Sequence, residues 1–282
     1  MTYLQAIIIG LLQGITELFP ISSLGHSVLL PSLFGWHNIV ASQTSSESFF
    51  LAFLVGLHVA TAIALLIFYR KKWAKIISGF FTSVKTRKAE TSDQRLAWLL
   101  VFATIPAALM GLVFEHQFRV IFAKPLYAAI FLTINGIILF IGEFYRRKVK
   151  REGATRKLAK LDYKEAGVIG VAQVFALLAG ISRSGITMVA GLVRGLDHED
   201  AANFSFLLAT PIILGAGLYK LPDLLGPNGA NVRGQVLVGS LMAGIAAYFS
   251  VKFLTKYFET KTLTPFAIYC VVVGGLMIIK FI

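Results

Sequence analysis

One arginine and three hydroxyl groups lie in a stretch of the chain that is otherwise apolar. The run from Ala166 to Val193 is interrupted by Ser182, Arg183, Ser184 and Thr187, with glycines on both sides. An arginine at the centre of a membrane segment costs about 2.5–3.5 kcal/mol on insertion scales, so it rarely lies there without a partner. The glycines permit a tight turn and close backbone approach to a ligand. A guanidinium, hydroxyls and the free N–H groups of a helix start together predict a pocket for a phosphate or a similar oxyanion. The alternative is a kinked core helix whose arginine snorkels to the membrane interface.

A second polar group interrupts the apolar stretch 2–33. It comprises Glu17, Ser22, Ser23 and His26. A carboxylate, an imidazole, a guanidinium and several hydroxyls inside a membrane form a set able to do general acid–base or nucleophilic work on a phosphate. Structural alternatives stay open for each of them. Glu17 could pair with Arg183 only to fix packing, serines often bond back to a carbonyl one turn earlier, and His26 alone would be favoured as a satisfied core histidine.

Composition identifies the class of protein to which these groups belong. The chain has 282 residues, of which 56% are hydrophobic and 15% charged, and a mean hydropathy of +0.74. Average soluble domains are about 45–50% apolar and about 25% charged, so we predict a polytopic helical membrane protein. Cys270 is the only cysteine, which excludes an internal disulfide and a cysteine-based metal cluster. No Lys or Arg precedes Arg70, so no cleaved signal peptide is expected.

We predict two halves of similar plan, 1–150 and 151–282, within one integrated membrane domain. In each half an interrupted apolar stretch, interpreted as a re-entrant helical hairpin, precedes three spans of the length that a membrane requires. The first half comprises a hairpin at 2–33 and spans at 49–69, 96–114 and 126–145. The second comprises a hairpin at 166–193, a short span at 204–218, and spans at 236–257 and 265–282.

Matches at a constant offset indicate that the two halves are repeats. At an offset of 160 residues, Gly10, Gln13, Ser22 and Gly25 match Gly170, Gln173, Ser182 and Gly185. Because three spans per half is an odd number, the second half must enter the membrane from the opposite side. The predicted fold is therefore an all-α polytopic membrane protein with an inverted-topology repeat, whose broken helices typically meet near the midplane and form the site there.

The basic residues predict the orientation in the membrane. The net charge is +13, and 21 of the 27 Lys and Arg residues fall in the loops 70–95, 146–164, 194–203 and 252–261. Nucleic acid is not an expected partner, because topology explains these loops: the positive-inside rule makes them cytoplasmic and leaves both termini outside. We expect a short interfacial helix around Trp73–Phe81. The basic loops could also attract anionic lipids, but orientation accounts for them without that.

Two motifs resemble the signatures of a known family. Gln13-Gly-Ile-Thr-Glu17, the following segment Pro20–His26, and Gly180-Ile-Ser-Arg-Ser-Gly-Ile-Thr187 are similar to the signatures of the bacterial undecaprenyl-diphosphatases, the BacA/UppP family. Further similar stretches run over most of the chain in the family's order, among them 58–64, 103–106, 205–211 and 265–269. The chain departs from the family's usual pattern at two positions: Ala179 stands where the family usually has proline, and Cys270 where it commonly has arginine. At position 13 the family has Glu or Gln, and this chain has Gln13, which cannot ionise.

The resemblance implies hydrolysis of undecaprenyl diphosphate to the monophosphate and inorganic phosphate. This reaction recycles the lipid carrier of cell-wall synthesis in the bacterial plasma membrane, at a site open to the outer side. Arg183 would hold the diphosphate and offset its charge, with Gln13, Ser22, Ser182, Ser184 and Thr187 as further substrate-binding residues. Ser23 is the preferred nucleophile, assisted by His26 and Glu17, and a phosphohistidine at His26 stays open.

Several alternatives stay open at this point. The same architecture would suit a lipid-carrier flippase that binds the headgroup at Arg183, or a purely structural scaffold. No cofactor is certain: a divalent cation, Mg²⁺ or Ca²⁺, would be weakly held by one carboxylate and hydroxyls unless substrate phosphates complete its shell. His58 is favoured as a helix-packing residue, and His37, His116 and His198 carry no functional signal. The oligomeric state is open, a homo-oligomer included.

Overall fold

Six membrane-length helices form the main body of the molecule. The computed structural model describes residues 1–282 except 43–48, 123, 221, 223–225, 227–229 and 231, and the side chains of 115, 116 and 118–122. In this part of the chain, the helices long and apolar enough to span a membrane are α4 (Phe49–Phe68), α6 (Ser92–Phe122), α7 (Pro125–Arg151), α10 (His198–Tyr219), α13 (Arg233–Tyr257) and α14 (Thr264–Phe281). The chain is an all-α, multi-pass membrane protein, as its hydropathy predicts.

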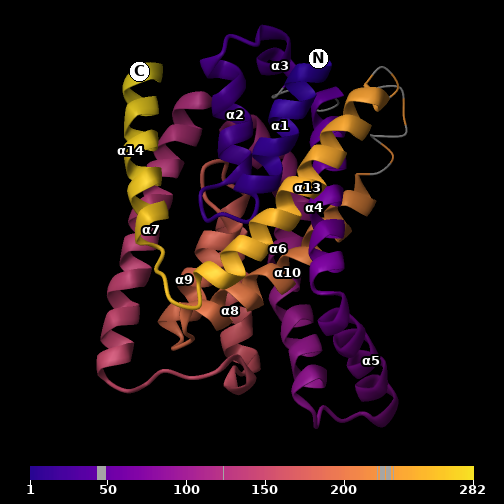
Figure 1. Cartoon of the computed structure of the whole chain (residues 1–282), viewed down its shortest axis with the longest axis vertical. Coiled ribbons are helices and arrows are strands. Elements are labelled where there is room, and N and C mark those ends of the chain that lie inside the picture. Colours follow the sequence, from indigo (N-terminus) through magenta and orange to yellow (C-terminus); the bar gives the residue numbers. More distant parts are fainter. Residues whose placement is uncertain (43–48, 123, 221, 223–225, 227–229, 231) are drawn as a thin grey trace.

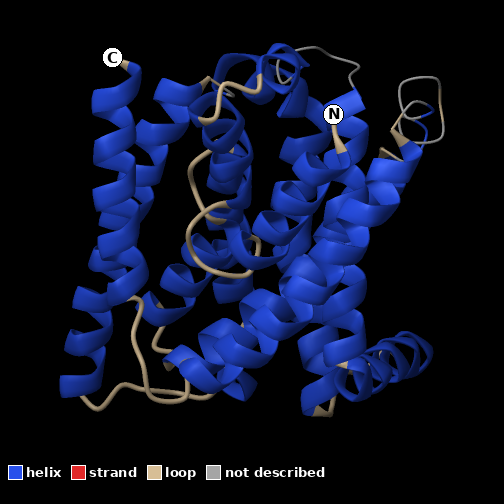
Figure 2. Cartoon of the chain, turned by 45° about the horizontal axis from the view of Figure 1, so that its top comes forward, coloured by secondary structure: helices blue, strands red, loops and turns tan. Residues whose placement is uncertain are grey.

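Shorter helices lie between and beside these six (Figures 1 and 2). They are α1 (Tyr3–Thr16), α2 (Ser23–Leu33), α3 (His37–Ser42), α5 (Arg70–Thr86), α8 (Tyr163–Val174) and α9 (Arg183–Val193). Single 3₁₀ turns occur at Leu158–Lys160 and Phe175–Leu177.

The helix bounds differ from the sequence-based expectation at several ends. The span predicted at 204–218 lies within a longer helix: α10 begins at His198, where the Asp197 side chain accepts a hydrogen bond from the Asp200 amide at 2.8 Å. An N-cap aspartate can start a helix well before its apolar run. The segment 70–95 holds a 17-residue helix, α5, in place of a short one. The sequence also predicts a polar loop from Ser42 to Glu47; Ser42 is the last residue of α3, and 43–47 lie outside the described residues, as does the side chain of His116.

Both expected interruptions are present as breaks between helices. α1 ends at Thr16 and α2 starts at Ser23, while α8 ends at Val174 and α9 starts at Arg183. Each second helix is capped by a serine whose Oγ accepts an amide proton three residues later, from Gly25 at 3.2 Å and from Gly185 at 3.1 Å. Such caps satisfy helix N–H groups that water cannot reach inside a membrane.

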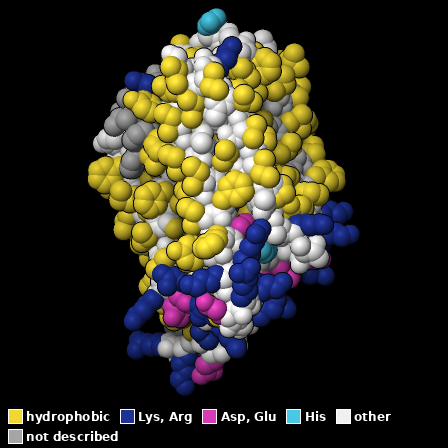
Figure 3. Space-filling model, turned by 90° about the vertical axis from the view of Figure 1, so that its left-hand side faces the viewer, with side chains coloured by type: hydrophobic (Ala, Val, Ile, Leu, Met, Phe, Trp, Pro, Cys, Tyr) yellow, Lys and Arg dark blue, Asp and Glu magenta, His cyan; other side chains and the backbone are white. Residues whose placement is uncertain are grey.

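The two broken pairs occupy different ends of the molecule. In Figure 1, α1 and α2 lie in the upper half, where both chain termini also lie, and α8 and α9 lie in the lower half. Figure 3 shows Lys and Arg side chains gathered at the lower end, below a broad apolar surface. The structure therefore separates one strongly basic end from a predominantly apolar outer surface that suits lipid.

Glycines let the broken helices approach their neighbours closely. A Cβ atom at Gly10 or Gly14 on α1 would collide with backbone carbonyls of Gly239 and Ala243 on α13. A Cβ at Gly170 on α8 would collide with the carbonyl of Ala103 on α6 in the same way. Small residues at crossings are the usual means by which membrane helices pack without a hydrophobic driving force.

Candidate functional site

Glu17 is the centre of the polar cluster that the two breaks form. Its Oε1 accepts a hydrogen bond from the Arg183 guanidinium at 3.0 Å. Its Oε2 accepts one from Ser23 Oγ at 2.5 Å and one from Gln13 Nε2 at 3.1 Å. Glu17 lies just after α1 and Arg183 is the first residue of α9, so the two helix breaks meet. A carboxylate that receives a serine hydroxyl on one oxygen and a cation on the other can accept the serine's proton.

Arg183 retains hydrogen-bonding capacity beyond this pair. One terminal nitrogen donates to the Ser205 carbonyl at 3.2 Å, the other donates to Glu17, and the buried Nε has no partner among the described residues. The side chain is only 11% exposed. A guanidinium in so dry a position, at the start of a helix, interacts strongly with an oxyanion.

His26 is held in one tautomer. Its Nδ1 lies 2.7 Å from the carbonyl oxygen of Ser22, which can only accept, so Nδ1 carries the proton. In the neutral ring Nε2 is then an acceptor, and it lies 2.8 Å from the hydroxyl of Tyr269 on α14. The two rings stack with centroids 5.8 Å apart. The basic nitrogen of His26 is thus covered by a tyrosine that can move aside or donate its proton.

The remaining predicted hydroxyls are bonded to protein groups. Ser22 Oγ accepts from the amides of both Gly25 and Gly180, each at 3.2 Å, and so joins the two breaks. Ser182 Oγ lies 3.0 Å from Ser184 Oγ, which donates to the carbonyl of Phe19, and Thr187 Oγ1 lies 2.7 Å from Ser205 Oγ. These residues are at most 3% exposed. In this structure the four hydroxyls stabilise the turns that carry Ser23, His26 and Arg183.

Asn135, on α7, is a residue that sequence analysis missed. Its Nδ2 donates to the carbonyl of Pro20 at 3.0 Å, and its Oδ1 accepts from the amide of Ser182 at 2.9 Å. One buried amide therefore bridges the two breaks. The buried Sγ of Cys270 lies 3.3 Å from the same Nδ2, so this departure from the family pattern sits beside the bridge.

We expect Asn135→Leu to destabilise the junction of the two breaks. The variant leaves the Ser182 amide and the Pro20 carbonyl without their partner, and each buried unsatisfied group costs about 1–3 kcal/mol. Thermal unfolding in detergent should show a clear loss, together with reduced activity. The matched control is Thr133→Val on the same helix, since Thr133 bonds only to the carbonyl of Ala129, at 3.0 Å. Equal stability of the two variants would contradict the bridging role.

His58 corrects another expectation. Sequence analysis favours a packing role for it, but its Nε2 lies 3.5 Å from Oε2 of Glu17. Its Nδ1 bonds to the carbonyl of Leu54 at 2.8 Å, which directs Nε2 toward the carboxylate. Helix periodicity alone does not distinguish this histidine from a packing residue, because its partner is 41 positions away in sequence. His198 also has a partner: its Nε2 lies 2.7 Å from Glu143 Oε1, and the same oxygen accepts from the Leu263 amide.

The donor set around Glu17 is a poor fit for a resident divalent cation. Both carboxylate oxygens already receive donors, one of them the cationic Arg183. The described residues contain no group of three or more His, Cys, Asp or Glu side chains placed to hold a metal. The buried Oε1 of Gln13 is an acceptor without a partner among the described residues, but it is a neutral amide oxygen, and Mg²⁺ and Ca²⁺ bind chiefly through carboxylates.

Comparison with known proteins places this chain in a family. The model of the family described as bacitracin resistance protein BacA matches residues 6–276. The chain is 54% identical to undecaprenyl-diphosphatase 2 of Frankia alni, over 100% of this chain and 98% of that protein. It is 53% identical to the undecaprenyl-diphosphatase of Mycolicibacterium paratuberculosis (98% and 96% covered) and 44% identical to undecaprenyl-diphosphatase 2 of Burkholderia thailandensis (95% and 93% covered). The protein whose two helix breaks meet at Glu17 and Arg183 belongs to the BacA family.

Proposed function

We propose that this chain hydrolyses undecaprenyl diphosphate to undecaprenyl phosphate and inorganic phosphate. Its relatives, similar over nearly their whole length, carry the name undecaprenyl-diphosphatase. The observation that carries the proposal is the 2.5 Å contact between Ser23 Oγ and a Glu17 carboxylate whose other oxygen meets Arg183. None of these relatives' names describes a flippase, and transport is not proposed.

In the first step Ser23 attacks the terminal phosphorus. Glu17 accepts the hydroxyl proton as the Oγ–P bond forms, and the bond from phosphorus to the bridging oxygen breaks, so that undecaprenyl phosphate leaves. Arg183 moves from Glu17 to the phosphoryl oxygens and offsets the charge spread over them, which is the main task of a phosphoryl-transfer enzyme.

In the second step water releases the phosphate from Ser23. His26 is suited to accept the water's proton, because its Nδ1–H is fixed on a carbonyl and its Nε2 is the free base once Tyr269 moves aside. The water oxygen bonds to phosphorus as the P–Oγ bond breaks, Ser23 recovers its proton from Glu17, and His26 releases the water's proton to solvent as inorganic phosphate leaves. Ser22, Ser182, Ser184 and Thr187 hold the two turns in place, and Gln13 orients Glu17.

We propose that His58 positions Glu17. Replacement by leucine should lower kcat/KM about tenfold, since Oε2 loses a polar neighbour that helps to orient it. His58→Gln, whose amide can still donate, should recover most of the activity. A purely packing role predicts instead that the kcat/KM of the leucine variant equals or exceeds that of the glutamine variant. Steady-state phosphate release with both variants separates these outcomes.

We propose that no divalent cation resides at Glu17, and that any cation needed arrives with the substrate phosphates. Metal analysis of the purified protein should find well below one Mg²⁺ or Ca²⁺ per chain. Chelation should leave the thermal midpoint unchanged. A stoichiometric cation that survives gel filtration, or a large fall in the midpoint with chelator, would contradict this proposal.

We also propose the inverted-topology repeat and its orientation. The helix starts support it, because they repeat at an offset of 160 residues. Helix α1 starts at Tyr3 and α8 at Tyr163. Helix α2 starts at Ser23 and α9 at Arg183, and a serine caps each of these two helices. Capping boxes begin α1 and α8 at Thr2 and Asp162, again 160 apart. The basic end would face the cytoplasm of a bacterial plasma membrane, with both termini outside. Cysteine-accessibility labelling at the N-terminus and on α5 tests this orientation.

Phosphate release by the purified full chain in detergent tests the function itself. Hydrolysis needs neither a bilayer nor a gradient, so wild-type protein should release phosphate from undecaprenyl diphosphate. The activity should fall very steeply in Arg183→Ala and strongly in His26→Ala. Wild-type protein that releases no phosphate, or turnover that both variants retain, would refute the proposed function. Light scattering on the same sample would test whether a homo-oligomer forms.

A further inference from the structure

Helix α5 has an inner stripe that packs on the protein and an outer apolar stripe that does not. The inner stripe includes Ile76, 3% exposed, and the buried Ser83, which accepts a hydrogen bond from Trp98 Nε1 on α6 at 2.9 Å. The outer stripe consists of Ile77, Phe81 and Val84, which are 48%, 67% and 50% exposed. Their spacing of four and three residues places them on one face of the helix. An apolar stripe of this kind on a basic surface helix requires an apolar cover.

The charge of α5 and of the residues after it indicates which kind of molecule covers its outer stripe. The segment 70–88 contains Arg70, Lys71, Lys72, Lys75, Lys85, Arg87 and Lys88, and it contains no Asp or Glu. Basic helices with an aromatic on the apolar face lie in the membrane interface and are attracted to anionic lipids. Figure 1 places α5 at the lower end of the molecule, the end where basic side chains gather in Figure 3.

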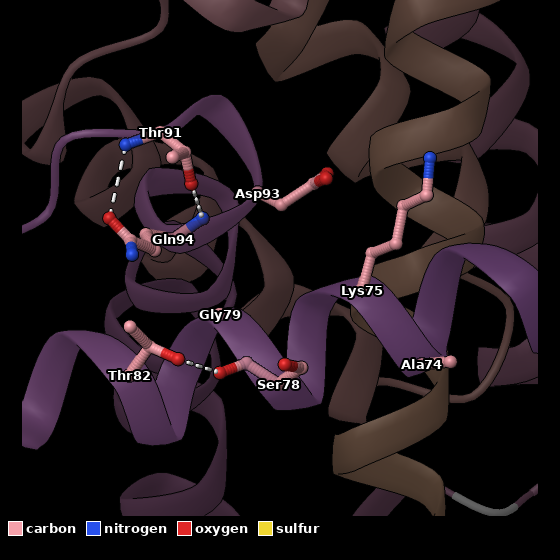
Figure 4. Close-up of a pocket in the computed structure, with 8 residues that line it drawn as sticks. All are labelled: Ala74, Lys75, Ser78, Gly79, Thr82, Thr91, Asp93 and Gln94. Atoms are coloured by element: carbon pink, nitrogen blue, oxygen red, sulfur yellow. Dashed lines mark hydrogen bonds between the residues drawn. The ribbon is translucent and has the colours of Figure 1, made fainter.

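Two cavities flank α5, and they differ in charge. The first, of about 440 Å³, lies between α5 and the start of α6, where Lys75 and Asp93 both line it (Figure 4). Asp93 is bound by Lys72 at 2.8 Å, and its carboxylate disfavours an anion. The second, of about 370 Å³, has no acidic residue in its lining, which includes Val84, Arg87, Lys88, Trp98, Phe102 and Tyr163.

Both cations of the second cavity have hydrogen-bonding capacity to spare. The Arg87 side chain has no hydrogen bond or ion pair with any other described residue. Lys88 meets Glu90 at 3.6 Å, but these side chains are 72% and 73% exposed, and such a surface pair contributes little. Arg87 ends α5 in a left-handed conformation, φ +55°, and lies beside the aromatic groups that line the same cavity. A cationic rim next to exposed aromatic rings matches the polar and apolar parts of one lipid molecule.

We propose that the cavity between α5, α6 and the start of α8 binds the headgroup of an anionic phospholipid. Arg87 and Lys88 contact the phosphate, and Trp98 and Tyr163 lie at the level of the glycerol ester groups. The acyl chains run along the lipid-facing side of α6, where Phe102 and Ile105 are 46% and 44% exposed. The outer stripe of α5 rests on the same leaflet. The volume falls within the range of about 300–1,000 Å³ typical of ligand pockets.

Competition between two lipids tests the site. The full chain, purified in detergent, is mixed with equal amounts of phosphatidylglycerol and phosphatidylcholine, and bound lipid is counted by native mass spectrometry. We expect about tenfold more phosphatidylglycerol than phosphatidylcholine on the wild type, and loss of this preference in Arg87→Ala/Lys88→Ala. Lys71→Ala/Lys75→Ala is the matched control, because it removes the same charge from the same basic segment, 70–88, and should retain the preference.

Other outcomes would overturn the proposal. Equal loss in both double variants would mean that the general positive field holds the lipid. Unchanged binding in Arg87→Ala/Lys88→Ala, or equal binding of the two lipids by wild-type protein, would mean that this cavity is no anionic-lipid site. An excess of inorganic phosphate should not displace the lipid. Brominated phosphatidylglycerol should quench the tryptophan fluorescence of the wild type more than that of Trp98→Phe, because Trp98 lines the cavity. Equal quenching in the two proteins would place the lipid elsewhere.

Discussion

Replacing Arg183 by alanine is expected to lower kcat/KM for undecaprenyl diphosphate by roughly 10³-fold. One oxyanion donor raises kcat by about 10²–10³-fold, and an arginine that stabilises a transferring phosphoryl group raises it by about 10³–10⁵-fold. Arg183 is the one arginine among the predicted site residues, and its buried Nε and its helix-start position are suited to that task. Phosphate release in detergent, with the substrate varied, measures the effect.

Stability must be separated from catalysis in this variant. Removing Arg183 leaves Glu17 buried with its main cation gone, and breaking a buried pair costs about 3–5 kcal/mol. Arg183→Lys retains the charge without the planar fork, so it should fold like the wild type and still lose most of the activity. Arg194→Ala, at the other end of α9, is the matched control and should retain full turnover. A lysine variant with wild-type kcat/KM would show that the fork geometry of Arg183 is not required.

Much of the polar cluster around Glu17 could be predicted from the residues, because charged and polar groups interrupt runs that are otherwise apolar. Glu17 and Arg183 are charged groups inside apolar runs, and inside a membrane such groups need partners. The structure brings them to 3.0 Å from segments 166 residues apart. The helix breaks could be predicted for a related reason, since Pro20 and the glycines near Ser22 and Ser182 disfavour continuous helix.

What could not be predicted depends on rotation and packing of whole helices. Asn135, Tyr269 and His58 are single polar residues on long apolar helices, and whether such a residue faces the site or a neighbouring helix is decided by contacts far away in sequence. Asn135 bonds to Pro20 across 115 residues, and Tyr269 meets His26 across 243. The start of α10 could not be predicted for the opposite reason: its first turn is polar and capped, so the apolar run marks only part of the helix.

Ser23→Ala is expected to lower the turnover by at least about 10³-fold, because no other group would take over the covalent step. His26→Ala should lose less, about 10²-fold, if it serves as a general base in the second step. The matched control is Ser32→Ala on the same helix, whose hydroxyl only donates to the carbonyl of Val28 at 3.0 Å. It should leave turnover unchanged.

The chemistry of the trapped intermediate decides between the two nucleophiles. Rapid acid quenching with substrate labelled at the terminal phosphate should yield a phosphoenzyme that is stable in acid and labile in alkali, as expected of phosphoserine, and it should accumulate in His26→Ala. A phosphohistidine would show the reverse stability and would persist in Ser23→Ala. The geometry favours serine because its hydroxyl already lies 2.5 Å from a carboxylate that can accept the proton, whereas the His26 Nε2 is covered by Tyr269. An acid-labile adduct would therefore assign the attack to His26 and require Tyr269 to move before the first step.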